Sequence, residues 1–242
     1  MVNVDIVEKT FNFRNNLQER SRTDMIVIHH TGENDIDASA EQIHDWHYNH
    51  QPDPWSGIGY HFVIRKDGTI ERGRPEWAVG SHAYGENSHT LGIHLSGDFQ
   101  QAVPTAAQVE KCAMLVAYLC EKYGITIDRE HIVGHGELMA TDCPGVNLQA
   151  LLDDGTITGK AIWYATDGGE KQTPKTANSD VSTETDRKNG RFCGLDEVPD
   201  WAKPTIRKLI DKGLLNGNGE GLDLSFDMIR MLVINDRAGV FG

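Results

Sequence analysis

The stretch TLGIHLSGDFQQAVPTAAQVEKCAMLVAYLCEKYGITIDREHIVGH, residues 90–135, contains a strand, a helix and a second strand in direct succession. Short apolar runs open and close it, at TLGIHLSG and at HIVGH, and both are typical of buried strands. Between them, apolar residues recur at helical spacing over residues 105–123, which predicts an amphipathic helix. Strands that alternate with helices predict an α/β sheet covered on its faces.

The predicted helix has clear ends and holds two of the four cysteines. Thr105 and Gln108 have the spacing of a capping box, and Gly124 is typical of a helix end. Cys112 and Cys120 are eight residues apart, which is about 12 Å along a helix and too far for a disulfide or a shared metal ion. We therefore expect both thiols to pack in the core.

Three further elements precede this unit. MIVIHHT, residues 25–31, is a β-branched run that predicts a buried strand. Residues 39–50 predict a helix capped by Ser39, and residues 58–73 predict a β-hairpin that turns at an Asp-Gly pair. These elements extend the α/β pattern toward the N-terminus.

The pattern predicts two domains with a linker between them. Residues 1–152 contain the α/β elements, whereas residues 153–190 are polar and read as a linker. Residues 191–242 carry two amphipathic helical patterns and predict a small helical module. About 50 residues make a marginal core, so we expect this module to dock on the first domain or to self-associate.

The charge of the 242-residue chain is distributed unevenly around a formal net value of −13. Residues 186–242 hold 9 Lys and Arg against 9 Asp and Glu, so residues 1–185 carry the whole excess. Such a surface repels phosphates over most of its area, which argues against nucleic acid as a partner.

The sequence also argues against membrane insertion and export by a leader. No apolar run approaches the roughly 20 residues of a membrane span. The N-terminus, MVNVDIVEKTFNFRNN, lacks the basic and apolar regions of a secretory signal. We therefore expect a chain made in the cytoplasm without a signal peptide, and four cysteines without a CxxC pair suit that reducing compartment.

The loop GHGELMATDCPG, residues 134–145, places His135 eight residues before Cys143. A thiolate combined with imidazoles selects zinc, and a catalytic zinc ion usually has three protein ligands. His29 and His30 are candidates for the third, because they stand at the end of a predicted buried strand. Adjacent strand residues face opposite sides, so only one of the two can reach the ion. Both faces of the strand carry apolar residues, so the alternation does not select between His29 and His30.

Five blocks in order over residues 25–148 resemble the zinc-dependent N-acetylmuramoyl-L-alanine amidases of the type-2 class: IVIHHT, IHDWH, GIGYHFVIRKDGTIERGR, VGSHAYGENSHTLGIHLSGDF and GHGELMATDCPG. That class also holds amidase-type phage lysozymes and peptidoglycan-recognition proteins. The resemblance implies an α/β fold with a central mixed β-sheet flanked by helices. It also implies one Zn²⁺ per chain, bound by His29, His135 and Cys143, with His30 facing the sheet packing.

The same resemblance implies roles for further residues. Tyr60 and Thr141 match family positions beside the metal, where they would donate hydrogen bonds to the oxyanion of amide cleavage or handle a proton. His82 and Asn87 match positions near the site and are expected to contact the sugar or stem peptide. Glu137, two residues after His135, is a candidate base or supporting group, although a solvated loop carboxylate is the simpler interpretation.

The implied function is hydrolysis of peptidoglycan at the amide bond between the N-acetylmuramoyl lactyl group and L-alanine. One alternative is a non-catalytic peptidoglycan-binding receptor, but such relatives lose the zinc cysteine, which this chain retains as Cys143. Another is a cytoplasmic amidase that recycles wall fragments, which would have no use for an additional C-terminal module.

That module loosely resembles a single S-layer-homology-type repeat, in VPDWAKPTIRKLIDKGLLNG. It departs from the repeat at DMIRM, where the second helix lacks the usual TRAE-like start. The resemblance implies attachment to the cell wall. A catalytic domain and a wall-binding tail without a signal peptide describe a phage or prophage endolysin that reaches the wall after release, with an autolysin exported by another route as the alternative.

Overall fold

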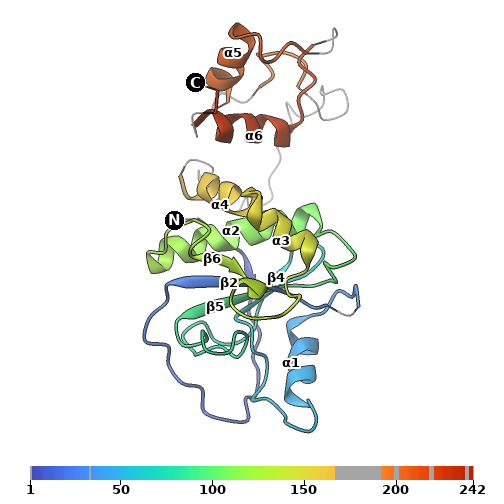
Figure 1. Ribbon diagram of the computed structural model, residues 1–242, viewed down its shortest axis with the longest axis vertical. Coiled ribbons are helices and arrows are strands. Elements are labelled where there is room, and N and C mark those ends of the chain that lie inside the picture. Colours follow the sequence, from blue (N-terminus) through green and yellow to red (C-terminus); the bar gives the residue numbers. More distant parts are fainter. Residues whose placement is uncertain are drawn as a thin grey trace, which may run out of the picture. The chain divides into compact units, whose positions relative to one another are not determined.

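The computed structural model describes residues 2–32, 34–166, 192–198, 202–217, 221–237 and 240–241. The chain divides into two compact units, Met1–Thr173 and Pro174–Gly242 (Figure 1). None of the helices in these described segments is both long and apolar enough to cross a membrane.

The first unit is built on one six-stranded sheet with the order β1-β4-β3-β5-β2-β6. The strands are β1 (Ile6–Val7), β2 (Met25–His30), β3 (Phe62–Ile64), β4 (Ile70–Arg72), β5 (Thr90–Leu95) and β6 (Ile132–Gly134). Strands β3, β5, β2 and β6 run parallel, whereas β4 is antiparallel to β3 and parallel to β1. The sheet is therefore mixed and flanked by helices, as predicted, and the β3–β4 hairpin confirms the expected turn. Strand β1 was not predicted.

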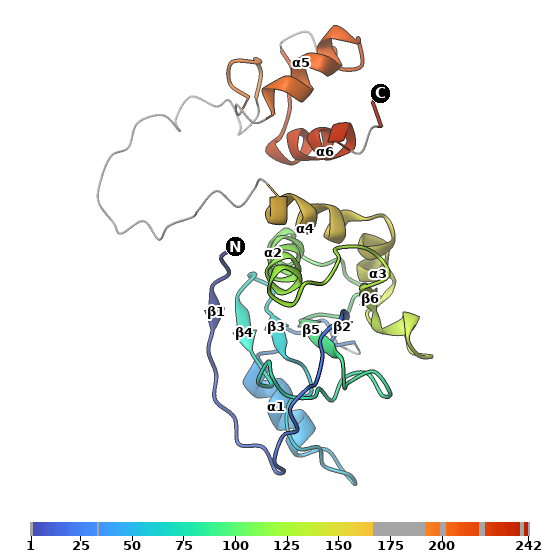
Figure 2. The same cartoon turned by 90° about the vertical axis from the view of Figure 1, so that its left-hand side faces the viewer.

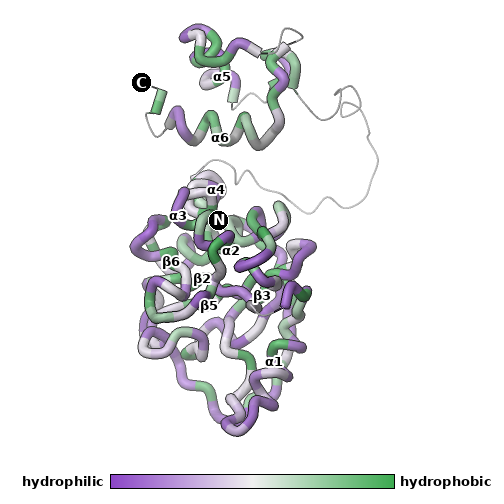
Figure 3. Tube along the Cα trace, turned by 45° about the vertical axis from the view of Figure 1, so that its right-hand side comes forward, coloured by the Kyte–Doolittle hydropathy of each residue, from purple (hydrophilic) through white to green (hydrophobic). Residues whose placement is uncertain are grey.

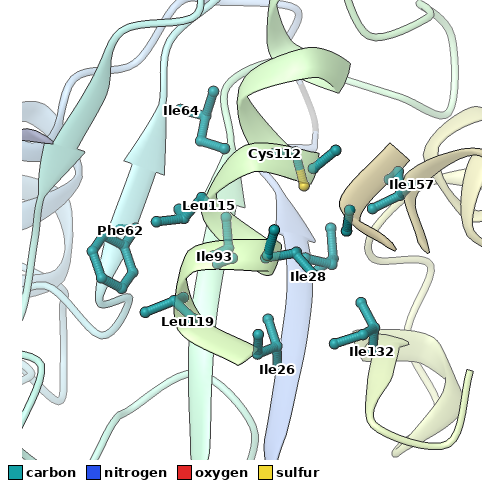
Figure 4. Packing of buried hydrophobic residues seen from close by; sticks show 14 of the residues in the cluster. Ile26, Ile28, Phe62, Ile64, Ile93, Cys112, Leu115, Leu119, Ile132 and Ile157 are labelled. Carbon is teal, nitrogen blue, oxygen red and sulfur yellow. The ribbon is translucent and has the colours of Figure 1, made fainter. Parts of the chain in front are cut away.

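Helix α2 (Ala106–Tyr123) covers one face of the sheet and forms the main core with it. Figure 4 shows Ile28 of β2 and Ile93 of β5 directed toward Leu115 of this helix. The predicted capping box at its start is present, and Gly124 ends the helix in the left-handed conformation that favours glycine. Its two cysteines are buried and free, which confirms their predicted role in packing.

Helices α3 (Val146–Asp153) and α4 (Thr156–Thr166) correct the predicted linker boundary. The linker was expected from residue 153, but α4 lies beside α2 (Figures 1 and 2). Ile157 and Ala161, one helical turn apart, are fully buried in the main core, and Tyr164 packs against it. Tertiary packing thus stabilises a helix in a segment whose Gly and Thr residues give it a weak intrinsic propensity. The rest of the predicted linker, residues 167–190, lies outside the described residues.

Helix α1 (Ala40–Tyr48) packs on a second, smaller hydrophobic cluster. The strand residues in this cluster alternate along the strand with those of the main core. Val63 of β3 belongs to this cluster, whereas its neighbours Phe62 and Ile64 belong to the main core. The β2–β5 pairing places His29 level with His94. The carboxyl ends of β2 and β6, with the 3₁₀ helix η1 (His135–Glu137) that follows β6, position the site described below.

The second unit has its own hydrophobic cluster between α5 (Lys203–Asp211) and α6 (Phe226–Arg237). Fully or almost fully buried side chains form it: Phe192, Val198, Ala202, Ile206, Leu224, Ile229 and Val233. An ion pair of 2.7 Å between Lys208 and Asp236 joins the two helices. Bands of hydrophobic and hydrophilic residues follow one another along α6 (Figure 3), as expected for an amphipathic helix.

Candidate metal centre

Strand β2 ends in two histidines whose side chains point to opposite faces of the sheet. His30 is 7% exposed, and its Nδ1 accepts a hydrogen bond of 3.1 Å from the backbone N–H of Phe99, a member of the main core. His29 is 1% exposed and lies on the other face, where its ring centroid is 4.5 Å from that of His135. The structure therefore brings His29, not His30, to the predicted site.

The loop after β6 brings His135 and Cys143 to the same point. Gly136 donates a backbone hydrogen bond of 2.6 Å to the carbonyl of Cys143, so the two ends of the loop meet. Gly134, the last residue of β6, allows this approach, because a Cβ there would lie 2.9 Å from Cδ of Pro144. The close approach explains why the motif needs glycine before His135.

His29, His135 and Cys143 present one ligand atom each, and these atoms all lie within 4.8 Å of one another. Nδ1 of His29 lies 3.6 Å from Sγ of Cys143. Nε2 of His135 is buried without a hydrogen-bond partner among the described residues. Zinc binds imidazole nitrogen at about 2.0–2.1 Å and thiolate sulfur at about 2.3 Å, so this donor set and spacing fit a zinc ion. Within the described segments it is the one such group found.

The protonation states of the three groups suit a cation. Burial lowers the pKa of His29 well below its usual value, and His82 and His135 add to the effect. Burial also lowers the pKa of His135, so both imidazoles are neutral and offer lone pairs near pH 7. Burial raises the pKa of the Cys143 thiol to about 12. A divalent cation deprotonates a coordinating thiol. The three groups are therefore neutral without an ion, and Cys143 would become a thiolate when an ion binds.

Tyr60 and Thr141 both border this centre. The ring of Tyr60 lies 4.9 Å from that of His29, and burial, with a smaller effect from Cys143, raises the pKa of its hydroxyl. The phenol therefore keeps its proton and can donate a hydrogen bond. Thr141 is exposed, and its Oγ1 accepts a hydrogen bond of 3.3 Å from the backbone N–H of Cys143.

His82 and Asn87, predicted to contact the substrate, both make hydrogen bonds within the protein. His82 is 8% exposed, and its Nδ1 lies 3.0 Å from Nε2 of His29. Oδ1 of Asn87 accepts hydrogen bonds of 2.8 and 3.0 Å from the backbone N–H groups of His82 and Ala83. Asn87 therefore stabilises the segment that places His82 against the candidate ligand His29.

Two further histidines that were not predicted for the site surround Tyr60. The ring of His94 lies 4.8 Å from that of Tyr60, and the ring of His47 lies 5.6 Å from it. Burial lowers the pKa of His94 to about 3 and that of His47 to about 4, so both are neutral. The alternation within TLGIHLSG was a usable signal for His94. The apolar residues Leu91, Ile93 and Leu95 share one face of the strand, so His94 points to the other face.

Glu137 is fixed in place beside His135. Its Oε1 accepts hydrogen bonds of 2.7 Å from the N–H of Gly134, 2.6 Å from Arg129 and 2.9 Å from Gln149. Burial raises the pKa of Glu137, but these hydrogen bonds outweigh it and hold the pKa below its usual range. The carboxylate therefore supports the loop that presents His135.

Comparison with known proteins gives matches over the same region. Residues 19–146 match the family model described as N-acetylmuramoyl-L-alanine amidase. The endolysin of Escherichia phage T7 is 33% identical over 138 residues, which cover 54% of this chain and 87% of that protein.

Solved structures also share the fold. The N-acetylmuramoyl-L-alanine amidase LysC from Clostridium intestinale is 39% identical with a TM-score of 0.57, and the match covers 65% of this chain and 97% of that one. Peptidoglycan recognition protein LE, solved in complex with tracheal cytotoxin, is 26% identical with a TM-score of 0.54, and the match covers 62% of this chain and 92% of that one. The first unit is thus similar both to enzymes and to recognition proteins.

Proposed function

This chain belongs to the N-acetylmuramoyl-L-alanine amidase family, and from that premise we propose that it cleaves peptidoglycan with one zinc ion bound by His29, His135 and Cys143. It is a peptidoglycan hydrolase, and the bond cleaved joins the N-acetylmuramoyl lactyl group to L-alanine of the stem peptide. The convergence of the three side chains from β2, η1 and the following loop is the observation that carries the zinc assignment.

An enzyme is favoured over a receptor with the same fold. The first unit is similar to recognition proteins as well as to amidases, so the fold alone does not decide between them. The donor set supports the enzyme, because a site that only binds a wall fragment needs no thiol next to two neutral imidazoles. Tyr60 and Thr141 beside that set supply the polar groups that amide hydrolysis requires.

When bound, zinc supplies a Lewis acid that polarises the scissile carbonyl and lowers the pKa of water. The chain itself contributes ligands and hydrogen-bond donors. His29 and His135 bind as neutral imidazoles and Cys143 binds as a thiolate. The Tyr60 hydroxyl, kept protonated by burial, donates to the oxygen that becomes negative as the amide is attacked. The exposed Thr141 hydroxyl is the second donor, and the loss of one such donor raises a barrier by about 2.7–4 kcal/mol.

The biological role that follows is that of an endolysin. The phage T7 relative bears that name, and its similarity to this chain extends over 87% of its own length. We assign the second unit, which has a hydrophobic cluster of its own, to attachment at the cell wall. The enzyme then acts on the wall after release from the cytoplasm, with peptidoglycan as its polymer substrate.

The test is mass analysis of purified peptidoglycan after digestion by the full chain. We expect new free amino termini on L-alanine and intact glycan strands, together with about one equivalent of zinc per chain. A chelator should remove zinc and activity together, and added zinc should restore both. New reducing sugar ends would indicate a glycosidase, and wall binding without any product would indicate a receptor.

A further inference from the structure

Behind the candidate ligand His29 lies a second buried histidine that the reaction itself does not use. Nδ1 of His82 lies 3.0 Å from Nε2 of His29, on the far side of the ring from Cys143. Nε2 of His82 lies 3.4 Å from Oγ1 of Thr90, and that hydroxyl donates a hydrogen bond of 2.9 Å to the carbonyl of Glu86. The contacts form a chain of three hydrogen bonds that ends on the backbone.

The order of donors in this chain follows from its fixed end. The Glu86 carbonyl can only accept, so the Thr90 hydroxyl gives its proton to it and accepts from Nε2 of His82. A neutral His82 with its proton on Nε2 has a lone pair on Nδ1, which must accept from Nε2 of His29. Nδ1 of His29, the nitrogen that faces Cys143, is then left with its lone pair free.

The reverse order would block the site. If Nδ1 of His82 carried the proton, it would donate a hydrogen bond to Nε2 of His29. The proton of a neutral His29 would then lie on its Nδ1. That proton would point at Sγ of Cys143, 3.6 Å away, and would occupy the lone pair that a metal ion needs. The anchor on Thr90 therefore selects the tautomer of His29 that can bind a cation.

The surroundings of His82 are shaped to its ring. A Cβ on Gly92 would lie 2.6 Å from Cγ of His82, and a Cβ on Gly80 would lie 2.5 Å from its Cδ2. Asn87 fixes the backbone of the same residue through the hydrogen bond to its N–H. The ring thus has one available position, between two glycines and against His29.

We propose that His82 is a positioning residue that fixes the tautomer and orientation of His29 for metal binding, through the chain that ends at Thr90 and Glu86. The proposal rests on the proposed zinc site. Partners of this kind typically account for 10–100-fold in metal affinity.

The test compares His82→Asn with His82→Leu in the full chain. The two replacements have nearly the same shape, but only asparagine offers an oxygen near the position of the histidine Nδ1. Zinc affinity is measured on metal-free protein by competition with a chromophoric chelator, and the melting temperature of the metal-free protein reports its folding. We expect His82→Leu to weaken zinc binding by about 10–100-fold and His82→Asn to recover most of that loss. His50→Leu, at an exposed histidine, is the control and should bind zinc as the wild type does.

Thr90→Val provides a second arm that leaves both histidines in place. It removes the hydroxyl that anchors His82 and should weaken zinc binding in the wild-type background but not in the His82→Leu background, because coupled residues are non-additive. This arm decides the matter if His82→Leu does not fold. Equal zinc affinities for His82→Leu, His82→Asn and the wild type, or equal losses in both variants, would overturn the proposal. So would a Thr90→Val variant that binds zinc as tightly as the wild type.

A third variant separates this proposal from the one on which it rests. His29→Ala removes the ligand itself and should lose zinc binding altogether. If His29→Ala binds zinc like the wild type, the zinc site has been assigned to the wrong residues. If His29→Ala loses zinc while His82→Leu keeps it, the site is correct and the role of His82 is wrong.

Discussion

Two neighbouring histidines at the end of β2 have opposite environments because strand side chains alternate. His29 lies in the candidate metal centre, whereas His30 is buried next to the main core and accepts a hydrogen bond from the N–H of Phe99. The alternation of the strand left the choice between them open, since both of its faces carry apolar residues, and only the family resemblance favoured His29. The packing of α2 on one face decides it.

His29→Ala and His30→Ala should therefore fail in different ways. The first should lose zinc and activity together and leave a folded domain. The second should keep zinc but lower the free energy of unfolding by about 1–3 kcal/mol, because the buried N–H of Phe99 loses its acceptor. Zinc content and urea unfolding of both variants distinguish the two effects. Full zinc occupancy in His29→Ala would exclude this residue as a ligand.

Cys143→Ser tests the second type of ligand. The hydroxyl of serine is a poor replacement for thiolate, so we expect zinc to be lost and wall lysis to fall to the level of the metal-free enzyme, with the fold retained. Cys193→Ser, at a cysteine of the second unit, is the matched control and should change neither property. The assignment fails if zinc-free Cys143→Ser digests peptidoglycan at the rate of the wild type.

The candidate ligands were predictable from short motifs, whereas the residues in contact with them were not. His135 and Cys143 share one loop, and a resemblance over five blocks pointed to them directly. His82 stands 53 residues from His29 in the chain, and only the folded structure brings the two rings into contact. Its position in a motif near the site suggested a substrate contact, because a motif does not reveal which way a side chain points.

Helix α4 shows the same limit for an element. Its sequence, TITGKAIWYAT, combines glycine and threonine with a few apolar residues, a composition that favours a linker when the sequence is considered alone. By contrast, α2 was predicted with both of its ends, because a capping box and a terminal glycine are local signals. A helix stabilised mainly by its neighbours carries no such local signal.

Truncation can measure the contribution of α4. A chain that ends at residue 152 loses Ile157 and Ala161, both fully buried, whereas a chain that ends at residue 166 keeps them. Burial of one isoleucine is worth about 1.5–3 kcal/mol, so the shorter chain should be less stable than the longer one by at least that amount. Urea unfolding of the two truncated proteins tests this expectation. Equal unfolding midpoints would mean that α4 adds nothing to the core.

Glu76, in the segment after β4, links that segment to the end of α2. It forms an ion pair of 2.6 Å with Lys122, accepts a hydrogen bond of 2.6 Å from Tyr123 and pairs with Arg72 at 2.9 Å. Burial raises the pKa of Glu76, but the hydrogen bonds from Lys122 and Tyr123 outweigh it, and the pKa lies below its usual value. The group therefore binds its proton more weakly in the folded state than in the unfolded state.

The sign of the pH dependence follows from that difference. A depressed pKa in the folded state stabilises the protein at pH values above the unfolded pKa of about 4.3, and this stability is lost as the pH falls through the folded value. Glu76→Gln should thus be less stable than the wild type at pH 7, by an amount on the scale of 1.5–3 kcal/mol for a hydrogen bond to a charged group. The difference should shrink as the pH falls below 4. Urea unfolding of both proteins with a chelator present, so that metal loss does not contribute, gives the measurement. A difference independent of pH would point to packing instead of charge.

Net charge is distributed unevenly along the chain. Residues 186–242 are balanced at 9 basic and 9 acidic residues, and the net charge of −13 belongs to residues 1–185. Cell walls rich in anionic polymers would repel such a surface, so the catalytic part has no electrostatic attraction toward its polymer substrate. Attachment by the second unit would overcome this repulsion, because a tether raises the effective substrate concentration to about the millimolar range without any new catalytic contact.

A truncation after Thr166 tests these separate roles of the two units, because it keeps α4 and all residues of the candidate metal centre. It should bind zinc and hydrolyse small soluble muropeptides at a rate similar to that of the full chain. On whole walls it should act more slowly and co-sediment poorly, because the enzyme would no longer be held at its polymer substrate. Residues 174–242 fused to a fluorescent reporter should bind walls without the catalytic unit. If the truncated enzyme instead co-sediments with walls as strongly as the full chain does, the second unit is not a wall anchor, and self-association through α5 and α6 becomes the better account of its amphipathic helices.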